Sequence, residues 1–90
     1  MRRGGAKRRR DANEQAIIVA LRALGATVVQ ISGEGVPDLL VAYEGRWTPL
    51  EVKRPRGRLT PEQQKLRGRA WFPVVSTVQA ALDEIRQVIE

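Results

Sequence analysis

The chain has 90 residues, the size of one small domain, and 42% of them are hydrophobic, which is enough for a globular core. Lysine and arginine number 16 against 10 acidic residues, so the net charge is +6. Cysteine and histidine are absent, which excludes disulfides, thiolate or imidazole metal ligands and the usual general base. Any catalysis would have to use carboxylates, lysine, hydroxyls or a metal ion held by oxygen atoms, which favours Mg²⁺ or Mn²⁺.

The first ten residues form a basic segment that contains six lysines and arginines and no acid. We expect residues 1–10 to be a flexible arm and residues 11–90 to be a single domain. The arm residues that are candidates for binding phosphates are Lys7, Arg8, Arg9 and Arg10. A tail that only aids solubility explains the same composition equally well. The apolar runs are far shorter than the roughly 18 residues that span a membrane, and we expect a soluble, intracellular, cytoplasmic protein.

The predicted elements alternate between helices and strands in the order α-β-β-β-α-β-α. Apolar residues at helical spacing predict a first helix over residues 11–24, with Asp11 as its N-cap. Apolar and β-branched runs predict strands at 26–31, 39–43, 47–53 and 72–75. Thr60 and Ser76 are the predicted N-caps of two further helices, and Pro49 indicates an edge or irregular position in the third strand. The pattern predicts an α/β fold with a mixed sheet.

Two short motifs lie at the ends of the predicted strands. Glu51 and Lys53 are two residues apart in a strand, so their side chains project from the same face, about 7 Å apart. Asp38 follows Pro37 at the start of the second strand, where an acidic residue is tolerated. Each motif alone is common, the first as an ion pair and the second as a turn. They indicate a site only if they meet on one face of the sheet.

The turn between the second and third strands decides whether these motifs meet. A two-residue turn at Gly45 and Arg46 pairs Asp38 with Lys53 and places Asp38 diagonal to Glu51 on the same face. A three-residue turn would put Asp38 on the opposite face unless a bulge intervened.

A third carboxylate, Glu14, lies in the first predicted helix. It follows Asp11 by three residues and completes a capping-box pattern. It also shares a helical stripe with Ile18 and Leu21, the face that must pack on the sheet. A carboxylate on a buried face needs a partner, which a metal ion would supply. The capping and metal-binding roles do not exclude each other.

In their order along the chain, these residues resemble a known family. The segment from Gly35 to Leu40 contains Asp38, and Glu51-Val-Lys53 follows thirteen residues after that aspartate. Leu59-Thr-Pro-Glu-Gln63 comes next. This set resembles the virus-type replication-repair nuclease (VRR-NUC) domain of the PD-(D/E)xK superfamily over residues 11–82.

The resemblance implies an α-β-β-β-α-β core, here with a C-terminal helix, and hydrolysis of DNA phosphodiester bonds that depends on Mg²⁺ or Mn²⁺. By this resemblance, Asp38 and Glu51 match the metal-binding acids, and the Val52 backbone carbonyl is a further ligand. Lys53 matches the lysine that orients or activates water, and Glu14 matches the helix carboxylate that supports a metal or its water. Gln63 matches the family's glutamine, although the neighbouring Gln64 could also occupy that position. The resemblance further implies an endonuclease selective for branched DNA, including four-way (Holliday) junctions, that acts as a homodimer. A bacterial or phage-type protein fits this description.

The basic loop after the third strand contains Arg54, Arg56 and Arg58. Its position beside the proposed site favours contacts with backbone phosphates over a merely solvated loop. Trp47 and Trp71 have the chemistry to stack on bases, although packing is the more common use of tryptophan. The alternative function is a non-catalytic basic nucleic-acid-binding protein, which the charge alone would explain.

Overall fold

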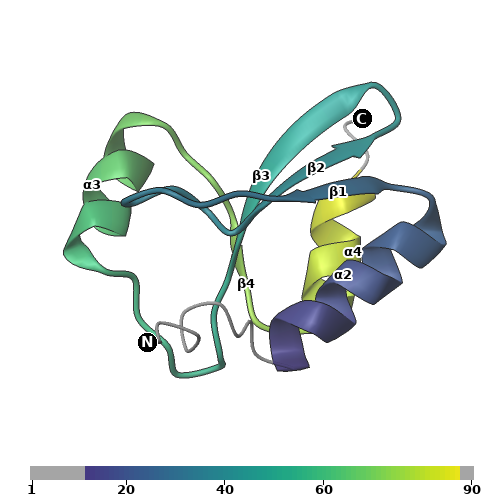
Figure 1. Ribbon diagram of the computed structural model, residues 1–90, viewed down its shortest axis with the longest axis horizontal. Helices are drawn as coiled ribbons and strands as arrows, with labels where there is room; N and C mark the ends of the chain where they lie inside the picture. Colours follow the sequence, from purple (N-terminus) through teal and green to yellow (C-terminus); the bar gives the residue numbers. More distant parts are fainter. Residues whose placement is uncertain (1–11, 88–90) are drawn as a thin grey trace, which may run out of the picture.

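The computed structural model describes residues 12–87, in which three helices surround a four-stranded sheet (Figure 1). The elements in chain order are α2 (Ala12–Leu24), β1 (Thr27–Gln30), β2 (Leu39–Tyr43), β3 (Arg46–Val52), α3 (Pro61–Arg69), β4 (Val74–Val75) and α4 (Val78–Ile85). This order confirms the predicted α/β class and element sequence. The basic arm and the predicted N-cap Asp11 lie outside the described residues.

The sheet is mixed, with the strand order β1-β2-β3-β4. The first three strands pair antiparallel, and β4 pairs parallel with β3. Side chains alternate between the two faces of each strand, so the sheet has two different surfaces. The apolar face carries the buried residues Val28, Leu39, Val41, Leu50, Val52 and Val75. The opposite face carries Asp38, Glu51 and Lys53. The alternation of side chains along the paired strands therefore brings the two predicted motifs to one face.

Helices α2 and α4 contact each other and cover the apolar face (Figure 1). They contribute Ile17, Ile18, Leu21, Ala81 and Ile85 to the core. Burying each of the larger side chains stabilises the fold by about 1.5–3 kcal/mol. Helix α3 stands apart from this layer, on the other side of β3 and β4 (Figure 1), and buries none of its residues.

The hairpin between β2 and β3 turns one residue earlier than predicted. Tyr43 pairs with Arg46, so the two loop residues are Glu44 and Gly45. Their φ angles are 47° and 82°, and two consecutive positive φ values are typical of the type I′ turn that closes two-residue hairpins. The predicted loop of Gly45 and Arg46 is therefore wrong.

This earlier turn shifts the pairing of the two strands by two residues. Leu39 pairs with Leu50, so Asp38 is aligned with Glu51 and not with Lys53 as predicted. A shift of two residues preserves the face on which each side chain lies. The predicted partner of Asp38 is wrong, while the prediction that all three side chains share a face is correct.

Pro49 lies in a part of β3 that has a neighbouring strand on one side only, as its predicted edge position requires. It pairs with Leu40 of β2 on one side, but β4 reaches only Glu51 and Val52 on the other. The backbone nitrogens of Glu51 and Lys53 donate toward the β4 side, to Pro73 and Val75. By alternation the nitrogen of Pro49 points to this same side, where β4 does not reach. A residue without an N–H is therefore tolerated there.

Several element ends differ from the predictions. Strand β1 covers Thr27–Gln30 of the predicted 26–31, and β3 covers Arg46–Val52 where 47–53 was predicted, so Lys53 lies just after the strand. Strand β4 contains only Val74 and Val75 of the predicted 72–75 run. Thr77, one residue after the predicted Ser76, is the N-cap of α4, because its Oγ1 accepts the Ala80 N–H at 3.0 Å. Within residues 12–87, no helix combines the length and apolar character needed to cross a membrane.

Candidate active site

Asp38 lies immediately before β2 and is held by both neighbouring strands. Its backbone carbonyl accepts the Ile31 N–H at 2.9 Å, and its Oδ2 accepts the Val52 N–H at 3.0 Å. In a continued ladder, the Val52 N–H would face the backbone at Pro37. The Asp38 carboxylate takes that place, so the aspartate side chain is fixed where β2 and β3 begin to separate.

The backbone carbonyl of Val52 lies on the same side of its strand as this hydrogen bond. The N–H groups of Glu51 and Lys53 donate to the carbonyls of Pro73, just before β4, and Val75, within it, each at 3.0 Å. Alternation along a strand directs the N–H and C=O of Val52 the other way, toward Asp38. The carbonyl of Val52 therefore points toward the strand end that carries Asp38, and its role as a metal ligand stays a prediction.

Glu51 is the most buried polar residue of this site, with 1% of its surface exposed. Its Oε2 is 3.2 Å from Lys53 Nζ and accepts the Gln63 Nε2–H at 3.0 Å. Its Oε1 is buried and has no hydrogen-bond partner within residues 12–87. An unsatisfied buried polar atom costs about 1–3 kcal/mol, a cost that a ligand at this oxygen would remove.

The environment of Glu51 also changes its affinity for protons. Burial raises the pKa of the Glu51 carboxyl above its ordinary value, and the nearby charge of Asp38 raises it further. The hydrogen bonds and charge supplied by Lys53 and Gln63 oppose this rise. The carboxylates of Asp38 and Glu51 therefore repel each other where solvent screens them little. A cation bound between them would relieve this repulsion.

Gln63 reaches Glu51 because the start of α3 holds its backbone N–H and the oxygen of its side-chain amide. Thr60 is the N-cap, and its Oγ1 accepts the Gln63 backbone N–H at 3.1 Å. The Gln63 Oε1 accepts the Thr60 N–H at 2.9 Å, which directs its Nε2 toward Glu51. Gln64 instead donates to the Leu59 carbonyl at 3.2 Å, so Gln63 is the glutamine at the site.

The loop that carries Asp38 packs against this same helix start. Gly35 has a φ of +81°, and a Cβ added there would lie 2.9 Å from the Glu62 carbonyl oxygen. Only glycine permits this approach without a shift. The loop before Asp38 and the helix with Gln63 thus support each other.

Glu14 is buried, with 6% of its surface exposed, on the side of α2 that carries Ile17 and Ile18. The neighbouring Asn13 ties the start of the helix to the Ser76 carbonyl at 3.0 Å. Across residues 12–87, no three acidic residues lie close enough together to hold a metal ion. Asp38 and Glu51 therefore form the described carboxylate pair, and the metal-supporting role of Glu14 stays a prediction.

The basic loop follows β3 and Lys53, the residue directly after that strand. Arg54, Arg56 and Arg58 are exposed, and the first two, with Gly57, line a hollow of about 310 Å³. The arm residues Lys7, Arg8, Arg9 and Arg10 lie outside the described residues. The predicted phosphate-binding role of the loop is consistent with this exposure and remains a prediction.

Two contacts at the site were not anticipated from the sequence. The pairing of Thr60 with Gln63 is visible as a Thr-x-x-Gln capping-box pattern, so this signal was available. Arg67 also anchors α3, because its Nε donates to the Phe72 carbonyl at 2.8 Å. No sequence pattern distinguishes that arginine from its exposed neighbours.

The fold and the paired motifs define an α/β domain with a PD-(D/E)xK-like core, in which helices flank a mixed four-stranded sheet. A solved structure described as "VRR_NUC domain" superposes with a TM-score of 0.63 and 25% sequence identity, covering 88% of this chain and 100% of that one. The chain therefore has the VRR-NUC fold, which confirms the family resemblance. The sequence matches no family model, and no curated protein matches it significantly.

Proposed function

We propose that this protein is a nuclease that hydrolyses DNA phosphodiester bonds with the help of a divalent metal ion. The observation that carries the proposal is the pair of Asp38 and Glu51, with Lys53 beside them and one buried oxygen of Glu51 lacking a partner among the described residues. The likeness to a VRR_NUC domain supports the same activity.

The residues present fit a hard cation such as Mg²⁺ or Mn²⁺, because every available donor is an oxygen atom. Asp38, Glu51 and the Val52 carbonyl would hold the ion, with Glu14 as a further candidate for supporting it or its water. The bound ion would supply positive charge at the scissile phosphate and a more acidic water molecule. Glu51 Oε1 is the described atom that most needs such a partner.

Lys53 and Gln63 have separate tasks in this proposal. Lys53 Nζ holds a positive charge at the edge of the site, where it can orient the attacking water and stabilise charge that develops on the phosphate. Gln63 keeps the Glu51 carboxylate in one orientation, so that Oε1 is presented to a ligand.

The substrate that we propose is DNA recognised by its shape. The loop after β3 exposes three arginines, Arg54, Arg56 and Arg58. Contacts from such residues to phosphates carry no base-sequence information. Selectivity for branched DNA such as four-way junctions, and action as a homodimer, belong to the same proposal and have only the family resemblance as support.

A cleavage assay tests the activity. Synthetic single-stranded, duplex, flap and four-way-junction DNA would be incubated with Mg²⁺, Mn²⁺ or EDTA. We expect cleavage only with a metal ion, and a loss on the order of 100-fold or more for Asp38→Asn, Glu51→Gln or Lys53→Met. Glu62→Gln, on the exposed side of α3, is the matched control for Glu51→Gln and should cleave normally.

The outcome that would overturn the nuclease proposal is equally concrete. If the folded protein cuts none of these substrates with either metal, while it binds them in a salt-dependent manner, the protein is a non-catalytic nucleic-acid-binding protein. Cleavage that persists in the Asp38→Asn and Glu51→Gln variants would point to a contaminating enzyme or a different site.

A further inference from the structure

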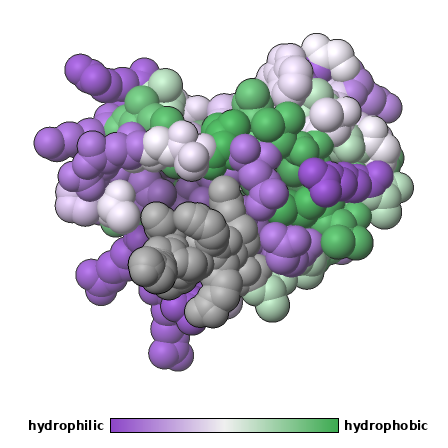
Figure 2. All heavy atoms as spheres, in the orientation of Figure 1, coloured by the Kyte–Doolittle hydropathy of each residue, from purple (hydrophilic) through white to green (hydrophobic). Residues whose placement is uncertain are grey.

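Helix α3 is unusual because it has no role in the core. None of its residues is buried, and residues 53–69 contain seven lysines and arginines against one acid. A nine-residue helix that packs no apolar face is marginal on its own. Hydrophilic side chains make up most of the surface on this side of the molecule, with a small hydrophobic patch among them, whereas the larger hydrophobic area lies over the strands and the other helices (Figure 2). The exposed surface of α3 therefore has a use other than packing.

The end of α3 is fixed by one arginine that holds a tryptophan ring. Arg67 donates its Nε–H to the Phe72 carbonyl at 2.8 Å. Its guanidinium carbon lies 3.6 Å from the centre of the Trp71 ring, within the range of a strong cation–π contact. Because Nε anchors the guanidinium to the backbone, the indole that stacks on it has a defined orientation and loses little rotational freedom when it binds a ligand.

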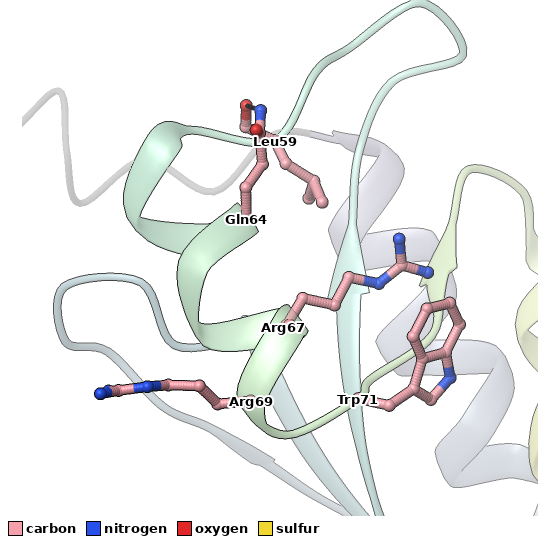
Figure 3. Close-up of a pocket in the computed structure, with 6 residues that line it drawn as sticks. Leu59, Gln64, Arg67, Arg69 and Trp71 are labelled. Carbon is pink, nitrogen blue, oxygen red and sulfur yellow. Dashed lines mark hydrogen bonds between the residues drawn. The ribbon is translucent and has the colours of Figure 1, made fainter.

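Trp71 nevertheless remains largely open to solvent. Its exposed fraction is 69%, so Arg67 covers one face of the ring and the opposite face is accessible. The ring borders a shallow cavity of about 600 Å³ beside the helix (Figure 3). The lining residues are Leu59, Gln64, Arg67, Gly68, Arg69 and Trp71.

The pair lies on the same side of the helix as the candidate active site. Gln63, which contacts Glu51, and Arg67 are four residues apart, which places them on one face about 6 Å apart along the helix axis. Phe72, which receives the Arg67 hydrogen bond, leads directly into β4, the neighbour of the strand with Glu51. A DNA strand that passes the site can therefore reach the ring.

We propose that Trp71, with Arg67 stacked on one face, is a binding platform for an unpaired nucleobase of the DNA substrate. A flat aromatic ring offers stacking of about 1–3 kcal/mol per base without sequence preference. The basic side chains of α3 supply charge for the adjoining phosphates. A base inside an intact duplex cannot stack there, so the platform favours single-stranded segments, such as those at flaps and open branch points. The inference deepens the proposed nuclease function and rests on it for its biological meaning.

Tryptophan fluorescence tests the platform without any cleavage. Only two tryptophans are present, so the Trp47→Phe variant contains Trp71 as its single emitter. In EDTA, an eight-nucleotide oligothymidylate should quench this emission in a saturable way, and a blunt-ended duplex hairpin should not. The Trp71→Phe variant, in which Trp47 reports, should show no comparable quenching.

Substitutions separate stacking from a merely structural role. Trp71→Leu should weaken oligothymidylate binding about 5- to 150-fold, the loss of one stacked base, whereas Trp71→Phe should retain most of the affinity. Arg67→Lys, which keeps the charge but loses the flat stacked group, should weaken quenching more than Lys65→Met does. Circular dichroism would check that each variant is folded.

The inference is wrong if oligothymidylate binds, as measured by anisotropy of a labelled strand, while Trp71 emission is unchanged. It is also wrong if the duplex quenches as strongly as the single strand, or if Trp71→Leu alters self-association and leaves DNA affinity intact, which would make the ring a protein contact. Metal-dependent cleavage with an unquenched Trp71 would remove this inference alone. Quenching without cleavage would remove only the proposed nuclease activity.

Discussion

The Gln63 side-chain nitrogen donates to Glu51 Oε2 at 3.0 Å, while the oxygen of the same amide accepts the Thr60 N–H at 2.9 Å. One side chain thus closes the first turn of α3 and fixes the orientation of a buried carboxylate. The helix that contributes nothing to the core is joined to the site by this amide, so local helix capping and site geometry are coupled.

Replacing Gln63 with glutamate tests that coupling. The Gln63→Glu variant retains a residue suited to the capping box, but it loses the amide donor and places a second negative charge against Glu51. We expect a destabilisation of about 1–3 kcal/mol at neutral pH, which becomes smaller in acid as a shared proton relieves the repulsion. Gln64→Glu, one residue later and exposed, adds the same charge and should change stability little. Urea unfolding at pH 5 and pH 8 measures both, and equal effects of the two substitutions would contradict the coupling.

Glu51 itself should make stability depend on pH in the absence of metal. Its folded pKa is raised above the ordinary value of 4.5, so the folded protein binds this proton more readily than the unfolded chain does. The contribution of Glu51 to stability is therefore full below pH 4.5 and is lost as the pH rises through the raised pKa. The Glu51→Gln variant resembles the protonated form, and its stability advantage over the natural protein should grow with increasing pH. Urea unfolding in EDTA from pH 4 to pH 8, with Glu62→Gln as the exposed control, measures this trend; a difference that is independent of pH would refute it.

The close approach at Gly35 should make even a methyl group costly. Gly35→Ala places a Cβ 2.9 Å from the Glu62 carbonyl oxygen at a φ of +81°, whereas Gly45→Ala has nearly the same φ of +82° and no atom within 4 Å. The Gly45 variant therefore measures the backbone cost alone, on the order of 1 kcal/mol, and the Gly35 variant should cost about 1–3 kcal/mol more. Only Gly35→Ala should also lower cleavage, because it moves the loop of Asp38 against α3. Equal losses of stability in the two variants would show that the contact does not matter.

Much of the fold could be predicted because local patterns and tertiary packing agree. The helical stripe of α2 matches one buried face, and the apolar run at Leu39–Tyr43 forms the predicted strand, although only Leu39 and Val41 are fully buried. The shared face of Asp38, Glu51 and Lys53 followed from period-two alternation, which tolerates an error of two residues in register. The exact register could not be predicted from the sequence, because the turn type depends on a positive φ at Glu44. Glutamate rarely adopts this conformation, so the sequence gives no signal for it.

The site was predicted less completely, for a physical reason. Glu51 and Lys53 were found because their spacing along one strand reveals a shared face, and Asp38 was added because the hairpin pairing brings it to that face. The contacts of Gln63, Arg67 and Trp71 depend on where α3 sits relative to β3 and β4, which no spacing along the chain determines. The role of Glu14 depends in the same way on the packing of α2.

The unusual Glu44 leads to a prediction of increased stability. Glu44 is the non-glycine residue of the described chain that has a positive φ, 47°, at the first loop position of a type I′ turn. Asparagine is strongly favoured there before glycine because its short side chain tolerates the left-handed region. Glu44→Asn should therefore raise the free energy of unfolding by about 0.5–1 kcal/mol. Glu44→Ala removes the same charge without relieving the backbone and should give no such gain, so urea unfolding of the two variants separates turn geometry from electrostatics. If Glu44→Asn were neutral or destabilising, the loop of Glu44 and Gly45, and with it the alignment of Asp38 with Glu51, would have to be revised.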